Sequence, residues 1–303
     1  MGKMQNNLHY FKISKDNQEK LLDDFYVFDD KNIDLSKYIE NTKEIKAILI
    51  TIKTLQDKKE KQAIIGKYFL ELSKTLGKFS NCSEFVCFIN ACDNILNGAK
   101  NEITLLKEIT KRYFAKRTLI EMVPEEWIQA ILDTNSSRKK GKCGENKLIN
   151  ILKKQDFIEV SSWDDFFKTD YCVVKFSKKF SLKNVRKNLG VKIKTKKQNK
   201  TLDLIIKAKD KILFCEAKQL NTSGGGQDKQ ISELIEIIGL KENNKISYIA
   251  FLDGKYSNVL LSDVGFGDKI TKQRKEINKF LKNNPNNYWL NTAGFEKLIS
   301  DLK

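Results

Sequence analysis

Two apolar segments separated by a short polar turn constrain the fold of this chain more than any other feature. TLDLIIK (residues 201–207) and KILFCEAKQL (residues 211–220) are rich in β-branched and other large apolar residues, which favour strands. Lys209 and Asp210 lie between them and predict a hairpin turn. Strands this apolar are usually buried on both faces, so we expect the hairpin to lie inside a sheet that helices flank on each side.

The segments around this hairpin predict strands and helices in alternation. The expected strands are YCVVKF (171–176), ISYIAFLD (246–253), NVLLSD (258–263) and YWLN (288–291). The expected helices are GENKLINILKKQ (144–155), DKQISELIEIIG (228–239), KITKQRKEINKFLKN (269–283) and AGFEKLISDLK (293–303). The predicted fold class is therefore α/β, with a mixed β-sheet flanked by helices.

The first part of the chain has a different pattern. Its apolar residues recur at three- and four-residue steps, which predicts helices over 44–56, 63–77, 83–98 and 125–132. A polar, basic stretch, DTNSSRKKGKCG (133–144), follows and predicts a break. We therefore expect a helical N-terminal domain over residues 1–135, for packing, dimer or DNA contacts, and a second domain over 136–303.

The composition limits the chemistry that this chain can perform. The six cysteines form no C-x-x-C pair and His9 is the single histidine, which argues against zinc and against histidine-based catalysis. The formal net charge is +17, which suits a polyanionic partner such as DNA. Lysine, asparagine and isoleucine are also encoded by A/T-rich codons, so the charge alone leaves both explanations open.

Charged residues interrupt the two apolar strands of the hairpin. Glu216 and Lys218 are two residues apart, which places both side chains on one face of the sheet. If the chain turns at Lys209 and Asp210, Asp203 lies directly opposite Glu216. Two carboxylates this close repel each other, and a divalent metal with a preference for oxygen ligands relieves the repulsion. A solvated hairpin face is the alternative.

Glu145 is a candidate fourth member of the site. It precedes Leu148, Ile149 and Leu152 on the helix face expected to turn inward, where its carboxylate could reach the metal or a metal-bound water. The alternative is that glutamate is simply favoured in the first turn of a helix by the macrodipole. Lys218 has two possible roles, which are to orient the attacking water or to stabilise charge on the phosphate.

These residues resemble the core motif of the PD-(D/E)XK nucleases, most closely as found in type II restriction endonucleases. Leu202-Asp203, twelve intervening residues and Glu216-Ala217-Lys218 match that motif, and Glu145 matches a carboxylate that members often carry on the preceding helix. The resemblance covers Gly141 to about Gly239, and Leu202 departs from the usual proline.

The resemblance implies a restriction-endonuclease-like fold and a nuclease domain over 136–303. It implies catalysis by Asp203, Glu216, Lys218 and Glu145, with Mg²⁺ held by Asp203, Glu216 and Glu145, and Mn²⁺ is expected to substitute. The expected reaction is cleavage of double-stranded DNA at a short sequence, leaving 5′-phosphate and 3′-hydroxyl ends. A homodimer matching a palindromic site and a cognate DNA methyltransferase are the expected partners.

Two regions are expected to contact DNA. The loop NTSGGGQ (221–227) resembles the Ser/Gly-rich turn that follows the catalytic strand in several such enzymes, where glycines allow close approach to phosphate. From Lys175 to Lys200 the chain has eleven Lys/Arg and no Asp or Glu, which predicts phosphate contact. The predicted DNA-binding residues are Ser223, Gly224, Gly225, Gln227, Gln230, Lys194, Lys196, Lys197, Arg138 and Lys139.

Two other functions are consistent with the sequence. One is a PD-(D/E)XK nuclease of DNA repair or recombination, and the other is a basic DNA-binding protein without catalysis. Metal-dependent cutting separates the nucleases from the binding protein, and discrete fragments separate restriction from repair. The sequence has no long apolar segment and no apolar signal core, so we expect a cytoplasmic bacterial protein and no membrane partner.

Overall fold

The chain folds into two compact units, which are described separately. The computed structural model describes residues 5–26, 34–134, 137–195, 201–222, 224–264 and 267–303. Residues 28–137 form a helical unit, and residues 1–27 together with 138–303 form a sheet unit. Among the described residues, no helix has the length and apolar character needed to cross a membrane.

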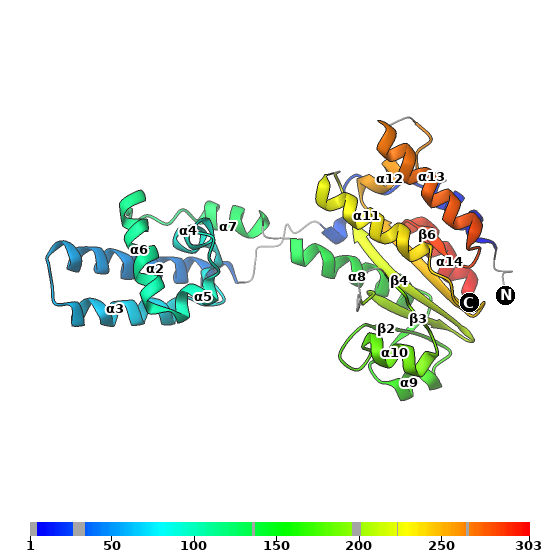
Figure 1. The fold of residues 1–303 in the computed structure, drawn as a ribbon, viewed down its shortest axis with the longest axis horizontal. Helices are drawn as coiled ribbons and strands as arrows, with labels where there is room; N and C mark the ends of the chain where they lie inside the picture. Colours follow the sequence, from blue (N-terminus) through cyan, green and yellow to red (C-terminus); the bar gives the residue numbers. More distant parts are fainter. Residues whose placement is uncertain (1–4, 27–33, 135–136, 196–200, 223, 265–266) are drawn as a thin grey trace. The chain divides into compact units, whose positions relative to one another are not determined.

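The helical unit contains the helices that the periodicity predicts. Apolar residues on successive turns, such as Ile45, Leu49 and Ile52, pack against Phe69 and Tyr113 in its core. The predicted helix over 83–98 is instead two helices, because the chain turns at Asp93 with φ 55°. The helices are α2 (Leu35–Asp57), α3 (Gln62–Thr75), α4 (Glu84–Ala91), α5 (Leu96–Asn101), α6 (Ile103–Lys116) and α7 (Glu125–Thr134) (Figure 1).

The sheet unit is built on one six-stranded mixed sheet in the order β1-β2-β3-β4-β5-β6. β2 and β3 are antiparallel, as are β3 and β4, whereas the other neighbours are parallel. The strands are β1 (Ile158–Glu159), β2 (Tyr171–Lys175), β3 (Leu204–Ala208), β4 (Lys211–Gln219), β5 (Ile246–Asp253) and β6 (Tyr288–Leu290). The predicted mixed β-sheet flanked by helices is confirmed.

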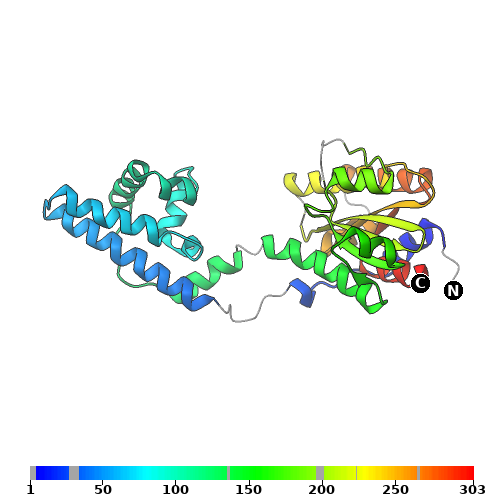
Figure 2. The same cartoon turned by 90° about the horizontal axis from the view of Figure 1, so that it is seen from below.

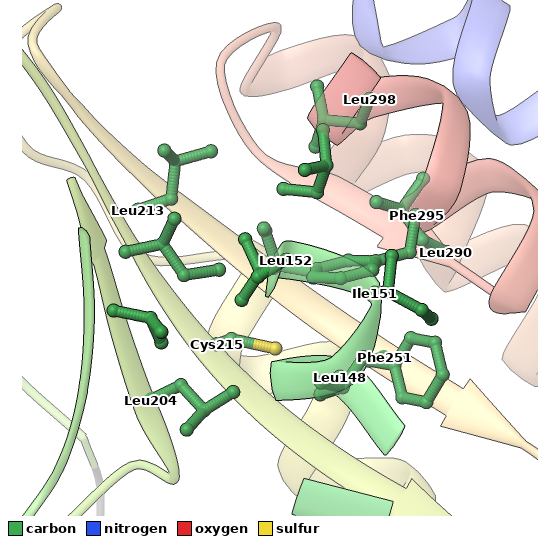
Figure 3. Close-up of a cluster of buried hydrophobic side chains, with 14 of the residues drawn as sticks. Leu148, Ile151, Leu152, Leu204, Leu213, Cys215, Phe251, Leu290, Phe295 and Leu298 are labelled. Atoms are coloured by element: carbon green, nitrogen blue, oxygen red, sulfur yellow. The ribbon is translucent and has the colours of Figure 1, made fainter. Parts of the chain in front are cut away.

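Helices cover both faces of the sheet (Figures 1 and 2). On one face, Leu148 and Leu152 of α8 and Phe295 of α14 pack on Leu204 and Cys215 of the hairpin (Figure 3). On the other face lie two further clusters, formed by α9, α10 and α11 and by α11, α12 and α13. The helices are α1 (Asn7–Asp16), α8 (Ser137–Lys154), α9 (Trp163–Lys168), α10 (Leu182–Leu189), α11 (Gly225–Ile238), α12 (Lys255–Leu261), α13 (Gly267–Asn283) and α14 (Thr292–Leu302).

Two predicted local structures are wrong. NVLLSD (258–263) was expected as a strand, but Lys255–Leu261 forms α12, whose Tyr256, Leu260 and Leu261 face the core at helical spacing. A short apolar run fits either structure, and only its packing decides between them. The predicted break at 133–144 is helical from Ser137 onward, because α8 begins there.

The predicted domain boundary needs one correction at the start of the chain. Residues 1–27 belong to the sheet unit and not to the helical unit. Tyr10 of α1 is fully buried in the same core as α8 and α14, and the Asn7 side-chain amide donates to the carbonyl oxygens of Leu281, Asn284 and Asn287. The N-terminal segment is thus an integral part of the sheet unit.

Candidate active site

The hairpin brings Asp203 and Glu216 to its open end, one residue beyond the paired positions. Ala208 pairs with Lys211 and Leu204 with Cys215, so Asp203 and Glu216 directly follow the last pair. The Asp203 N–H donates to the Cys215 carbonyl at 3.0 Å. Lys209, with φ 53°, forms the predicted turn together with Asp210. The predicted turn and the register up to Leu204 and Cys215 are confirmed, and the direct opposition of Asp203 and Glu216 stays a prediction.

Glu216 and Lys218 lie on the sheet face opposite to α8. Cys215 and Ala217 pack with the α8 cluster, so their alternating neighbours in the strand point the other way. Glu216 is only 2% exposed, and the Lys218 Nζ lies 2.5 Å from its Oε1 atom. A buried carboxylate needs such a cation, because removing a charge from water is costly.

Asp203 is held close to this pair. Its Oδ2 atom accepts a hydrogen bond of 2.7 Å from the Ala217 N–H. Burial raises the pKa of Asp203 from 3.8 to about 6, and the negative charge of Glu216 adds to the rise against the opposing effect of Lys218. The two carboxylates thus repel each other at close range, and Lys218 offsets part of this repulsion at Asp203.

Neutralising Asp203 is expected to stabilise the protein in a pH-dependent way. Because the folded-state pKa is raised, ionisation destabilises the fold, and this effect is absent below pH 3.8 and complete above about pH 6. We expect Asp203→Asn to raise the free energy of unfolding at pH 8 by about 1–3 kcal/mol, with little gain near pH 4. Urea unfolding without metal at both pH values measures the difference.

The matched control for this variant is Asp210→Asn. Asp210 is exposed in the turn of the same hairpin, so its neutralisation should leave the free energy of unfolding nearly unchanged at both pH values. An equal loss of stability at pH 4 and pH 8 for Asp203→Asn would show that its ionised carboxylate is accommodated without strain.

Glu145 lies beside the hairpin but is not in the first turn of its helix. α8 begins at Ser137, so a preference for glutamate at a helix start does not explain its position. Its Oε2 atom lies 3.3 Å from the Lys175 Nζ at the end of β2. Its charge contributes to the raised pKa of Asp203, which places the two carboxylates within electrostatic range of each other.

The donor set fits a magnesium ion with few protein ligands. Asp203 and Glu216 offer hard carboxylate oxygens that repel each other at close range. Among the described residues, no group of three or more His, Cys, Asp or Glu side chains is placed to hold a metal. The predicted set of Asp203, Glu216 and Glu145 is therefore not gathered into one ligand cluster in this structure, where the Glu145 carboxylate pairs with Lys175. Mg²⁺ commonly binds through one or two carboxylates and keeps several waters.

The glycine loop leads into α11. Gly224 precedes the helix, and the Gln227 Oε1 lies against it, so that a Cβ added at Gly224 would be 2.7 Å from that atom. Gly225 is exposed and faces open space, whereas Gln230 is half-buried. Ser223 lies outside the described residues.

The basic stretch is divided between structural and surface positions. Arg186 donates to the carbonyl oxygens of Lys192 and Ile193 at 2.9 and 2.8 Å, and Lys175 pairs with Glu145, so both side chains have protein partners in this structure. The exposed lysines are Lys178, Lys179, Lys183, Lys187, Lys192 and Lys194. Lys196 and Lys197 lie outside the described residues, as do the side chains of Arg138 and Lys139.

The segment that contains the site is similar to a known protein family. Residues 126–259 match the family model described as DpnII restriction endonuclease. The predicted resemblance to a restriction endonuclease is confirmed. Neither the curated proteins nor the solved structures compared with the chain gave a match.

The restriction-endonuclease segment contains every element of the candidate site. It runs from α7 into α12 and includes α8 with Glu145, the hairpin with Asp203, Glu216 and Lys218, and the glycine loop. The match indicates a nuclease and implies DNA as its substrate. It also contains two buried charged residues that the sequence did not single out, Lys147 at 4% exposure and Asp253 at 1%. Asp253 had a signal in the sequence, because it ends an otherwise apolar strand.

Proposed function

We propose that this chain is a type II restriction endonuclease that hydrolyses double-stranded DNA at a short specific sequence and requires Mg²⁺. The observation that carries the proposal is that the carboxylates of Asp203 and Glu216 lie close together with Lys218 beside them, inside the segment that matches a restriction endonuclease family. Buried charges of this kind at the edge of an apolar core are typical of catalytic sites.

In the proposed reaction, Asp203 and Glu216 would hold Mg²⁺, with Glu145 as a further carboxylate beside them. When bound, the ion would supply Lewis-acid chemistry at the phosphate and a more acidic water. A water oxygen forms a bond to phosphorus while the bond to the 3′ oxygen breaks, and one water proton passes through solvent to the 3′ oxygen. The products carry a 5′-phosphate and a 3′-hydroxyl. The protonated Lys218 donates hydrogen bonds, either to the water or to the phosphate as its charge grows.

The charge distribution supports DNA binding by the sheet unit. The sheet unit has 39 Lys/Arg against 23 Asp/Glu, whereas the helical unit has 17 against 16. Phosphate contacts supply most of the non-specific affinity for DNA, so we assign them to the sheet unit, including Lys194 and the glycine loop. The helical unit is nearly neutral, which favours contacts with protein over contacts with phosphate.

We also propose two partners, a second copy of this chain and a DNA methyltransferase. A homodimer would supply one active site for each DNA strand, and a cognate methyltransferase would protect the host sequence. Both follow from the proposed restriction activity.

Digestion of unmethylated plasmid DNA with and without Mg²⁺, by wild type and by Asp203→Ala, tests the proposed function. We expect discrete fragments that require Mg²⁺ and disappear in the variant, because the variant loses a metal ligand. An Mg²⁺-dependent smear would replace restriction by a repair-type nuclease. Catalysis would be rejected if the protein bound DNA in a salt-sensitive way but did not cut it. The DNA used for this result contains all short sequences, both with and without methylation.

A further inference from the structure

A second group of charged side chains lies beside the catalytic hairpin, and the proposed mechanism does not use it. The Lys147 Nζ on α8 lies 2.8 Å from the Asp253 Oδ2 at the end of β5 and 2.6 Å from the Asp23 Oδ2. The Tyr26 hydroxyl donates to the same Asp253 oxygen at 2.9 Å. Lys147 and Asp253 are buried, whereas the Asp23 side chain is 19% exposed. Removing one partner of a buried ion pair is costly, because it leaves a buried charge without compensation.

Half of this cluster comes from the N-terminal strap, which we define as residues 17–26. Glu19 fixes the strap at a second point, because its Oε1 accepts from the Thr292 N–H at 2.6 Å and its N–H donates to the Asn258 Oδ1 at 2.6 Å. The strap also lines a pocket of about 90 Å³ together with Gln219, which directly follows Lys218. It therefore lies at the end of the catalytic strand, far from that strand in the sequence.

The cluster ties α8 to the strands that carry the active site. Lys147 is two residues from Glu145, and Asp253 pairs with Gln219 in the β4–β5 register. On its other side, α8 is tied to β2 by Glu145 and Lys175. The middle of α8 is thus fixed to β2 and to β5, and β3 and β4 lie between these two strands.

The strap and α8 also meet through close packing. A Cβ added at the buried Gly144, next to Glu145, would lie 3.1 Å from the Tyr26 hydroxyl oxygen. The backbone at this point of α8 therefore has little freedom to shift while the strap is in place.

We propose that Asp23 and Lys147, together with Asp253, are positioning residues that hold Glu145 at the catalytic hairpin, and that the N-terminal strap is required for this geometry. The inference rests on the proposed nuclease function. Removing a residue that orients a metal-site residue without touching the metal typically lowers metal affinity or activity by about 10- to 100-fold. A merely structural cluster would instead alter stability and leave the cleavage rate of folded enzyme unchanged.

A double-mutant cycle on the full chain separates these two roles. Single-turnover cleavage of plasmid DNA with Mg²⁺ is measured for wild type, Asp23→Asn, Glu145→Gln and the double variant. We expect Asp23→Asn to lower the rate by about 10-fold in the wild-type background and by less than about 2-fold with Glu145→Gln. The DNA affinity without metal should stay unchanged, because Asp23 acts on the geometry and not on binding.

Two further variants complete the test. Tyr26→Phe removes only the hydroxyl that donates to Asp253, so it replaces Asp23→Asn in the cycle if the latter does not fold. Leu281→Ala, in the core at α13, should lower the unfolding temperature without changing the rate of the folded enzyme.

The outcomes distinguish this inference from the proposed function. An equal rate loss from Asp23→Asn in both backgrounds, or no loss in either, would overturn the positioning role while Asp203→Ala still abolished cutting. Cleavage by Asp203→Ala at the wild-type rate would overturn the proposed function, and the positioning role with it.

Discussion

Lys218→Met is expected to reduce the single-turnover rate of DNA cleavage by about 10²–10³-fold. The substitution keeps most of the side-chain volume but removes the ammonium group that lies 2.5 Å from Glu216. No hydrogen-bond donor then remains at this position for the water or the phosphate. The measurement is the rate of plasmid cleavage with enzyme in excess and saturating Mg²⁺, so that DNA binding and product release do not limit it.

A charge-matched control separates catalysis from DNA binding in this experiment. Lys245→Met removes the same charge at an exposed position before β5, and its cleavage rate should match that of wild type. Both variants should bind DNA without metal about equally. If Lys218→Met cuts at the wild-type rate, Lys218 only neutralises Glu216 and a different group stabilises the transition state.

The hairpin could be predicted from sequence because its constraints are local. A polar turn of two residues fixes the register, and strand alternation then fixes which side chains share a face. These two rules predict that Leu204 pairs with Cys215, as it does in the structure, and one residue further along they predict Asp203 opposite Glu216. Lys218 follows from the same alternation.

The remaining geometry depends on contacts between distant parts of the chain. Lys147 bonds to Asp23 and Asp253, which are 124 and 106 residues away in sequence. Periodicity carries no information about such pairs, and it also failed to assign residues 1–27 to the sheet unit. The difference in net charge between the helical unit and the sheet unit depends on this boundary, because net charge can be assigned only to a unit whose residues are defined.

Lys147→Met is expected to lower the free energy of unfolding by about 3–5 kcal/mol. The loss of the ammonium leaves the buried Asp253, at 1% exposure, and the partly exposed Asp23 without the cation that both contact. Such a change is a large part of the stability of an ordinary domain, about 5–15 kcal/mol. Urea unfolding at pH 8, monitored by fluorescence, measures it.

Lys175→Met provides the matched control, because it removes the other ion pair in the middle of α8. Both partners of that pair, Lys175 and Glu145, are 32% exposed, so solvent screens their attraction and the loss should be below about 1 kcal/mol. Adding Asp253→Asn to Lys147→Met should recover part of the lost stability, since it removes one of the carboxylates left without Lys147. If Lys147→Met instead costs no more than Lys175→Met, water screens the cluster and this part of α8 is held by apolar packing alone.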